Sequence, residues 1–230
     1  MQNPPPSFSH PLILLAAGRS SRMGSPKGLL SIEGAPWIVH QLRRFREIGG
    51  RHVFVVLGHW EAEYRRANEM EGAQSGDLEI EFVKNPAPDR GAFSSVQLGI
   101  EAVLRHALTF SGPVPALNRE SALALLPLDV PVPHASVWTK LSAAFKAEAV
   151  SAVLPELNQK GGHPVLLSRE FARRLLDYPL EREDARLDHQ LRALSPVEIL
   201  RIPVKDPEVL LNLNQPAQWR EYLRSLGRRL

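Results

Sequence analysis

The sequence of 230 residues contains no cysteine. This absence excludes a disulfide framework, a thiol nucleophile and any metal site built on thiolates. A large excess of one charge is also missing, because the formal net charge is +3 at neutral pH and acidic and basic residues are interspersed. Charge therefore gives no indication of nucleic-acid binding, and we expect no nucleic-acid partner.

No hydrophobic run is long enough to cross a bilayer. The first ten residues, MQNPPPSFSH, hold three consecutive prolines and lack the apolar core of a signal peptide. They predict a disordered, Pro-rich leader over residues 1–10. We therefore expect a soluble, cytoplasmic protein without a membrane partner.

Two common nucleotide-binding motifs are missing as well. A Walker loop requires a glycine, four residues and then Gly-Lys-Ser/Thr, and no segment supplies it. The G-x-G-x-x-G fingerprint of NAD(P)-binding domains does not follow the first strand either. Both absences disfavour an ordinary P-loop protein and an ordinary dinucleotide-binding domain.

What the sequence does contain is a regular alternation of apolar strands and amphipathic helices. Continuous apolar runs, typical of buried parallel strands, occupy 12–15, 53–57 and 122–128. Helical spacing follows each of them. The alternation predicts an α/β fold, a doubly wound, mostly parallel Rossmann-like sheet with helices on both faces. Length and a 43% hydrophobic content suit one large domain over 11–230.

Strand signals weaken in the later part of the chain. Residues 158–204 are interpreted as a possible subdomain on the substrate side of the sheet. Residues 209–211 are predicted to be extended, and a last helix is predicted from Pro216 to Leu226.

The stretch LILLAAGRSSRMGSPKGLL, from Leu12 to Leu30, joins the first strand to the polar segment after it. Small residues at 16–18 allow a ligand to approach backbone N–H groups, and Arg19, Arg22 and Lys27 add positive charge. Such a loop suits a polyphosphate. The alternative is a solvated connection in which Gly and Pro only turn the chain.

A carboxylate, Asp129, stands at the end of another apolar strand, within LPLDVPVP. Open α/β sheets bind ligands at the carboxyl ends of their strands. Magnesium takes one or two protein oxygens together with phosphate oxygens and water. The cations Arg22 and Lys27 with Asp129 therefore favour phosphoryl or nucleotidyl chemistry on a magnesium nucleotide, although Asp129 also suits a simple turn.

Six segments resemble one family in order, from Leu12 to about Tyr222. They are LLAAGRSSRMGSPKGLL, VFVVLGH, NPAPDRGAFSSVQLGI, LPLDVPVP, KGGHPVLLS and NLNQPAQW. Together they resemble the MobA-like nucleotidyltransferases, and among these the molybdenum-cofactor cytidylyltransferases. The late Asn212 and Asn214 are instead more similar to the guanylyl members.

The resemblance implies roles for individual residues. The backbone of Leu15, Ala16, Ala17 and Gly18 would border the nucleotide, and Ser95 would lie near its base or ribose. Arg22 and Lys27 would hold the phosphates and act as the catalytic cations. Asp129 and Asn214 would bind Mg²⁺, and His163 of the Gly-His-Pro loop would contact the acceptor.

Several of these residues have a purely structural alternative. Asn214 lies before Gln-Pro and suits a helix cap. His163 suits a hydrogen bond within its own turn. Lys160, Arg182 and Arg186 are further cations that would meet an anionic substrate, or would simply be solvated.

The sequence thus predicts an enzyme that transfers a nucleoside monophosphate from an NTP, with CTP favoured over GTP, to a phosphorylated small molecule, and that releases pyrophosphate. Molybdopterin is the leading acceptor, and a molybdoenzyme is a possible partner. A sugar-phosphate nucleotidyltransferase is one alternative. A non-catalytic nucleotide or cofactor carrier, or chaperone, of the same fold is another. The oligomeric state stays open.

Overall fold

The computed structural model describes residues 8, 10–70, 77–109 and 122–227. Most of the predicted leader and the connector over 110–121 lie outside these residues. Phe8 and His10, at the end of that leader, are buried. The His10 ring lies 2.9 Å from the Ser142 hydroxyl and accepts a hydrogen bond of 3.1 Å from the N–H of Ala122. The chain therefore enters the packed body of the protein before residue 11.

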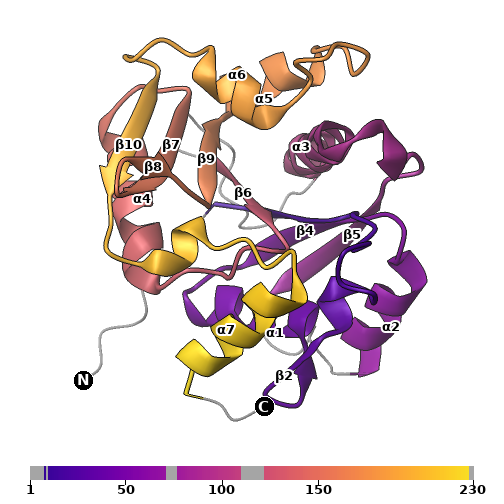
Figure 1. Ribbon diagram of the computed structural model, residues 1–230. Helices are drawn as coiled ribbons and strands as arrows, with labels where there is room; N and C mark the ends of the chain where they lie inside the picture. Colours follow the sequence, from indigo (N-terminus) through magenta and orange to yellow (C-terminus); the bar gives the residue numbers. More distant parts are fainter. Residues whose placement is uncertain (1–7, 9, 71–76, 110–121, 228–230) are drawn as a thin grey trace.

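One eight-stranded sheet forms the centre of the protein, in the order β10-β7-β9-β6-β1-β4-β5, with β8 beside β7 (Figure 1). The strands are β1 (Leu12–Ala16), β4 (His52–Leu57), β5 (Glu79–Lys84), β6 (Ala122–Pro127), β7 (Ala152–Leu157), β8 (Lys160–Gly161), β9 (Val165–Ser168) and β10 (Ile199–Pro203). Neighbours pair in parallel, except that β9 runs antiparallel to β6 and β7, and β8 antiparallel to β7. The predicted mostly parallel sheet is confirmed.

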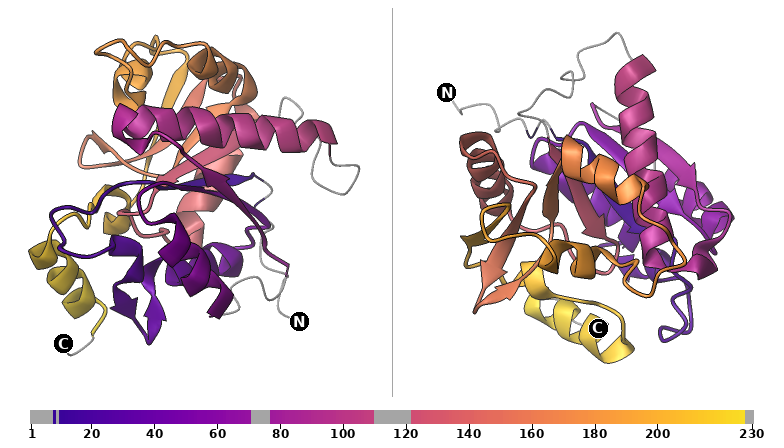
Figure 2. Two further views of the ribbon diagram at one scale, coloured as in Figure 1. Left: turned by 90° about the vertical axis from the view of Figure 1, so that its right-hand side faces the viewer. Right: turned by 90° about the horizontal axis from the view of Figure 1, so that it is seen from above.

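Helices cover both faces of the sheet (Figure 2). One face packs against α1 (Trp37–Glu47), α2 (Glu61–Met70), α4 (Ala135–Ala147) and α7 (Pro216–Ser225). The other packs against α3 (Ala92–Thr109), α5 (Arg169–Leu176) and α6 (Leu187–Arg192). Short 3₁₀ turns are η1 (Lys27–Leu29), η2 (Pro88–Arg90) and η3 (Pro207–Leu210). The resulting three layers are the predicted Rossmann-like architecture.

The apolar run of β1 follows from this layering. Leu12 and Leu14 belong to the core under α1 and α4, while Ile13 belongs to the core under α3. Because successive side chains of a strand point to opposite faces, a strand buried on both sides must be apolar throughout. None of these three side chains is more than 1% exposed.

The direction in which strands are added reverses beside β1. From β1 the chain adds β4 and β5 on one side, and then returns to add β6 on the other. Such a switch point opens a crevice at the carboxyl ends of the central strands, where α/β proteins bind ligands. The loops after β1 and β6 meet there, as the sequence predicts.

The local structure differs from the sequence prediction at two places. The segment 209–211, predicted to be extended, is partly a 3₁₀ turn, η3, because the Asp206 carboxylate caps it by accepting from the N–H of Glu208 and Pro207 takes its first position. The two-residue strands β2 (Ser31–Ile32) and β3 (Ala35–Pro36) are an addition to the predicted elements. The chain turns between them through Glu33 and Gly34, both at positive φ.

No helix among the described residues has the length and apolarity needed to span a membrane.

Candidate nucleotide and metal site

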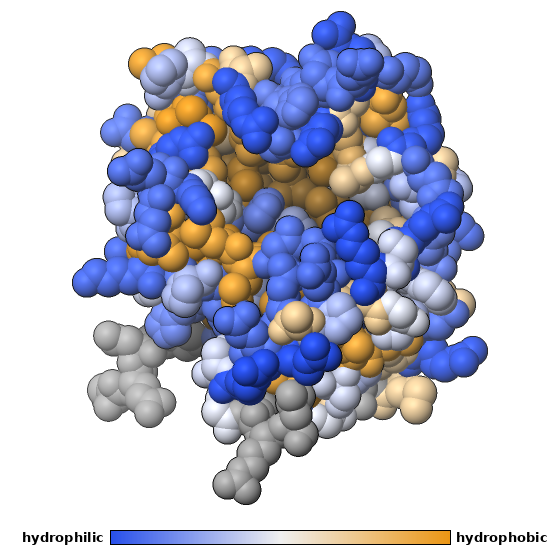
Figure 3. Space-filling view, in the orientation of Figure 1, coloured by the Kyte–Doolittle hydropathy of each residue, from blue (hydrophilic) through white to orange (hydrophobic). Residues whose placement is uncertain are grey.

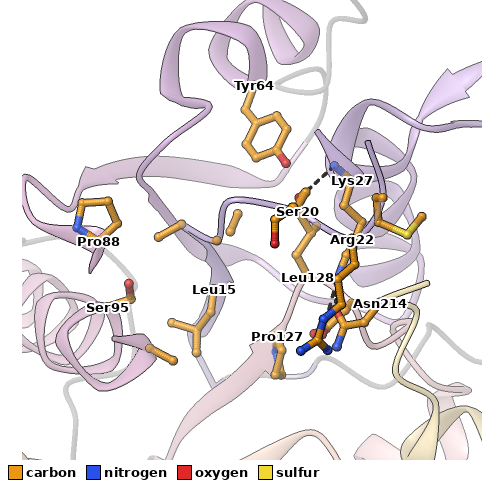
Figure 4. Close-up of a pocket in the computed structure, with 17 residues that line it drawn as sticks. Leu15, Ser20, Arg22, Lys27, Tyr64, Pro88, Ser95, Pro127, Leu128 and Asn214 are labelled. Carbon is orange, nitrogen blue, oxygen red and sulfur yellow. Dashed lines mark hydrogen bonds and ion pairs between the residues drawn. The ribbon is translucent and has the colours of Figure 1, made fainter. Parts of the chain in front are cut away.

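A cavity of about 460 Å³ lies at the switch point (Figure 4). Nine residues singled out from the sequence line it: Leu15, Ala16, Ala17, Gly18, Arg22, Lys27, Ser95, Asp129 and Asn214. Arg22, Lys27 and Asn214 lie on one side, and Pro88 and Ser95 on the other. Residues that are 199 positions apart in sequence, from Leu15 to Asn214, therefore form one site.

The loop after β1 packs closely against the end of β4. A Cβ atom on Gly58 would lie 2.6 Å from the carbonyl oxygen of Ala17, so only glycine leaves this backbone in place. Gly18 faces open space, since a Cβ there would meet nothing within 4 Å. This loop is thus packed from behind at Ala17 and open at Gly18, and all three residues line the cavity.

Lys27 is the buried cation of the site. Its ammonium nitrogen lies 3.4 Å from the Asp129 carboxylate and donates a hydrogen bond to the side-chain oxygen of Asn214. Burial lowers the pKa of Lys27, and the neighbouring Asp129 carboxylate partly opposes this shift. Asp129 therefore helps to keep this buried ammonium charged.

Backbone hydrogen bonds hold Lys27 in place. The N–H of Lys27 donates to the hydroxyl of Ser20 at 3.1 Å, and the N–H of Gly28 donates to the hydroxyl of Tyr64 at 3.1 Å. A Cβ on Gly28 would lie 2.8 Å from the Tyr64 ring, which explains the glycine directly after the lysine. The α2 helix, through Tyr64, thus fixes the position of the cation.

The side chain of Asn214 does not cap α7. Gln215 takes the cap position and Gln218 completes a capping box, so the capping alternative for Asn214 is wrong. The Asn214 amide nitrogen donates to the side-chain oxygen of Asn212, which turns the Asn214 oxygen toward Lys27. Its role as a metal ligand stays a prediction.

The loop that carries Asp129 is held by two buried side chains of α1. The Trp37 indole N–H donates to the carbonyl of Leu128 at 2.6 Å. The Gln41 amide donates to the carbonyl of Val130 at 2.6 Å and accepts from the N–H of Val132 at 3.1 Å. The backbone on both sides of Asp129 is thereby fixed.

Gln41 provides a prediction about stability. The side chain is 1% exposed, and replacing it with methionine leaves one carbonyl and one N–H buried without partners. Each such group costs roughly 1–3 kcal/mol, so we expect Gln41→Met to lower the free energy of unfolding by that amount for each group. Urea denaturation measures the loss. An unchanged free energy of unfolding would contradict the stabilising role of these Gln41 hydrogen bonds.

The loop cations Arg19 and Arg22 have different surroundings. Arg19 forms an ion pair of 2.6 Å with Asp89, whose pKa it holds below the usual range, and its Nε lies 3.2 Å from the His59 ring. Arg22 lines the cavity and forms no ion pair within the described part of the chain. Of the two arginines, Arg22 is therefore the one available to phosphates.

Ser95 lies in the first turns of α3, across the cavity from Lys27. The buried Asn85 side chain, which follows β5, donates hydrogen bonds of 2.9 Å to the hydroxyls of both Ser94 and Ser95. Asn85 also accepts from the N–H of Ala87 at 2.9 Å. This bonding explains why an Asn-Pro turn and a serine pair occur together in the sequence.

A second cavity, of about 630 Å³, adjoins the first and shares Leu15, Ala92 and Pro127 with it. Figure 3 shows a hollow with an apolar floor and a hydrophilic rim on this face. His163 lines this second cavity rather than the first. Its Nδ1 atom is buried without a hydrogen-bond partner among the described residues, so it makes no hydrogen bond within its own turn. Burial also lowers the pKa of His163.

The remaining cations divide between this cavity and the surface. Arg186 lines the second cavity, and its Nε lies 2.9 Å from Asp188. Arg182 is bound to Asp184 and to the Tyr178 hydroxyl, both at 2.9 Å, and Lys160 lines neither cavity.

Gln41 and Tyr64 hold parts of the site, and neither is among the residues that the sequence indicated. Gln41 lies between Ile38 and Leu42 on the apolar side of a predicted helix, and a polar residue at such a position is a signal of a buried hydrogen-bonding role. Tyr64 gave no signal, because a tyrosine on an amphipathic helix is most simply a core residue.

The donor set suits a hard divalent cation. One carboxylate oxygen, from Asp129, and one amide oxygen, from Asn214, converge on a single positively charged group, the ammonium of Lys27. Hard cations prefer oxygen ligands of this kind. Binding of a metal ion by Asp129 and Asn214 stays a prediction.

Comparison with known proteins identifies the family. The sequence model of the MobA-like NTP transferase domain matches residues 12–197. The chain belongs to this family. A stretch of 154 residues is 27% identical to the bifunctional protein GlmU of Acidovorax sp. (strain JS42), and covers 66% of this chain and 29% of that protein. Another, of 149 residues, is 29% identical to CMP-5'-(3-aminopropyl)phosphonate synthase of Streptomyces rubellomurinus, and covers 62% and 20%.

A shorter stretch of 53 residues is 40% identical to 2-C-methyl-D-erythritol 4-phosphate cytidylyltransferase of Leptospira interrogans, and covers 22% of each chain. The chain thus spans less than a third of the length of these curated relatives.

Solved structures share the fold over nearly the whole chain. Rv0371c of Mycobacterium tuberculosis superposes with a TM-score of 0.69 at 19% identity and covers 94% of this chain and 98% of its own. A nucleotidyl transferase of Methanothermobacter superposes with a TM-score of 0.67 at 20% identity, and covers 95% and 97%. Rv0371c has also been solved as a complex with manganese, with a TM-score of 0.65 to this chain.

Proposed function

We propose that this protein is a Mg²⁺-dependent cytidylyltransferase that transfers CMP from CTP to a phosphorylated small molecule and releases pyrophosphate. The observation that carries the proposal is the contact of the Lys27 ammonium with both Asp129 and Asn214, in the cavity that the loop at 16–18 also lines. A buried cation, two convergent oxygen donors and a supported loop are the parts needed to hold a nucleoside triphosphate with its metal.

The residues of the site have different roles in the proposed reaction. Arg22 and Lys27 bind the triphosphate, and Lys27 stabilises the charge that grows on the α-phosphate and on the leaving pyrophosphate. Mg²⁺, when held by Asp129 and Asn214, neutralises phosphate charge. An oxygen of the acceptor phosphate forms a bond to the α-phosphorus while the bond to the pyrophosphate oxygen breaks. This displacement needs no protein nucleophile, only alignment of the two substrates.

The choice of CTP is supported by the resemblance of the Leu12–Leu30 signature to cytidylyl enzymes and by two relatives whose names include CMP or cytidylyl transfer. Ser95, opposite Lys27, is proposed to lie near the base or ribose. The reaction is proposed to take place in the cytoplasm, with molybdopterin as the leading acceptor and a molybdoenzyme as the possible partner that receives the product.

The second cavity is the proposed acceptor site, because it shares three lining residues with the nucleotide cavity and combines apolar walls with cations. Its side chains Phe93, Leu154 and Leu191 suit the body of a ring or another largely apolar molecule. His163 would contact that molecule. Arg201 lines the cavity and makes no ion pair among the described residues, so it is available to a phosphate.

A charge-removal variant tests this acceptor site. A charge-assisted hydrogen bond contributes about 1.5–3 kcal/mol, so Arg201→Met is expected to raise the KM for the acceptor roughly 10- to 100-fold. The KM for CTP is expected to stay unchanged. Arg224→Met, an exposed arginine of α7, is the matched control. Equal KM values for the acceptor in both variants would remove Arg201 from the site.

The enzyme proposal is tested by pyrophosphate release from CTP, GTP and ATP with Mg²⁺ and a panel of acceptors. The panel contains molybdopterin, sugar phosphates, methylerythritol 4-phosphate and an aminoalkyl phosphonate. Release above background with CTP supports the proposal. Preference for a sugar phosphate as acceptor would instead identify a sugar-phosphate nucleotidyltransferase. Background release with every pair would contradict an enzymatic role.

The alternative from another class is a carrier or chaperone that binds a nucleotide without turning it over. Calorimetry separates the two, because a carrier binds CTP but fails the pyrophosphate assay. The arrangement of Asp129 with Lys27 favours the enzyme, since a protein that only binds a nucleotide does not require a metal-binding carboxylate.

A further inference from the structure

Three side chains of types that commonly bind metals, His52, Glu79 and His106, lie close together at the amino ends of the strands, away from the nucleotide site. His52 and Glu79 are the first residues of the parallel strands β4 and β5, and His106 lies in the last turn of α3. The nucleotide cavity adjoins the carboxyl ends of the strands, whereas these residues lie at the amino ends. The cluster is therefore separate from the proposed catalytic site.

The fold places the three side chains together. His52 and Glu79 are direct partners in the strand register, so their side chains point to the same face of the sheet. That face is covered by α3, which lies across it in Figure 2. The His106 ring packs edge-on against Phe54, two residues along β4 from His52, with ring centroids 5.5 Å apart.

The distances are close to those of a metal centre. The His52 Nδ1 atom lies 3.1 Å from a Glu79 carboxylate oxygen. One ligand atom from each of the three residues lies within 4.8 Å of the other two. Ligand atoms of a tetrahedral zinc ion are about 3.3 Å apart, as its bond lengths of roughly 2.0–2.1 Å require. Zinc binding would therefore require the three side chains to move closer together.

A second carboxylate orients one of the imidazoles. The Nδ1 atom of His106 lies 3.5 Å from the Glu81 carboxylate, and Arg105 lies 3.9 Å from the same group. A carboxylate on one ring nitrogen fixes the tautomer and makes the other nitrogen a better ligand.

We propose that His52, Glu79 and His106 form a zinc-binding site that fastens the end of α3 to the amino ends of β4 and β5. Two imidazoles and one carboxylate are ligands typical of Zn²⁺, and water would fill the fourth position. The proposal is independent of the nucleotidyltransferase reaction, since no residue of the cluster lines either cavity.

The test uses the full chain after treatment with EDTA, in an Asp129→Ala background that removes the other carboxylate candidate for metal binding. Calorimetry with ZnCl₂ is expected to show one equivalent bound, and Zn²⁺ is expected to raise the Tm. Glu79→Gln and His106→Gln are expected to abolish both effects. Glu81→Gln, which changes only the orienting carboxylate, is expected to weaken Zn²⁺ binding roughly 10- to 100-fold.

Glu79 is an exposed side chain, so Glu79→Gln is expected to fold like the parent, and its Tm without metal checks this. His189→Ala, at a half-buried histidine of α6 outside the cluster, is the control for incidental binding by other imidazoles. Binding that is lost in Glu79→Gln and kept in His189→Ala supports the site. Absence of Zn²⁺ binding in the parent, or equal binding in all variants, would overturn it.

Discussion

Replacing Lys27 with methionine is expected to lower the rate of nucleotidyl transfer by roughly 10³-fold, the scale observed when one preorganised group that stabilises transition-state charge is removed. Methionine has a similar length, so the change removes the charge and leaves most of the packing. The folded structure is expected to persist, because burial already disfavours the charged form of Lys27. Single-turnover rates with saturating CTP and acceptor measure the effect.

Lys205→Met provides the matched control, because this lysine is exposed and lines neither cavity. Its rate is expected to equal that of the wild type. A Lys27→Met variant that keeps its rate within a factor of ten would remove the buried ammonium from the mechanism.

Replacing Asp129 with asparagine is expected to have a comparably large effect, roughly 10³-fold on turnover, because the proposed metal ion would lose its carboxylate ligand and several kcal/mol of charge stabilisation with it. The side chain keeps its size, so the loop held by Gln41 is expected to stay in place. Metal titrations of the rate are expected to show that the variant needs much more Mg²⁺ or Mn²⁺. Asp177→Asn, at an exposed aspartate after α5, is the control.

The Asp129→Asn variant is also expected to change how the rate depends on pH. In the proposed reaction Lys27 acts in its protonated form, so activity is expected to fall as pH rises through the pKa of Lys27. The Asp129 carboxylate raises that pKa against the effect of burial, and removing it lowers the pKa further. The alkaline fall in the residual rate is therefore expected to move to lower pH. An unchanged alkaline limb would contradict the coupling of these two residues.

Local patterns were sufficient to predict the layered fold. The doubly buried strands are continuous apolar runs because each contributes side chains to both cores. The region around β9 was harder to interpret, since this strand runs antiparallel to β6 and β7 and a four-residue apolar run does not reveal its direction.

The candidate site was predicted as a set of residues but not as a geometry. Strand ends and loop charge indicated Arg22, Lys27 and Asp129, because parallel strands bring their carboxyl ends to one edge. The sequence did not indicate that Asn214 would face Lys27 rather than cap α7, since that depends on Gln215 and Gln218 completing the cap. The division between the two cavities, with His163 in the second, also depends on tertiary packing.

If this site transfers the α-phosphate of a nucleotide together with its nucleoside, isotopic labelling will show it directly. CTP labelled either at the α-phosphate or at the γ-phosphate is incubated with Mg²⁺ and the acceptor panel. We expect α label to move to the acceptor in wild type and not in Lys27→Met, and γ label to leave in pyrophosphate. Transfer of γ label to the acceptor, or CTP binding with no transfer of either label, would contradict it.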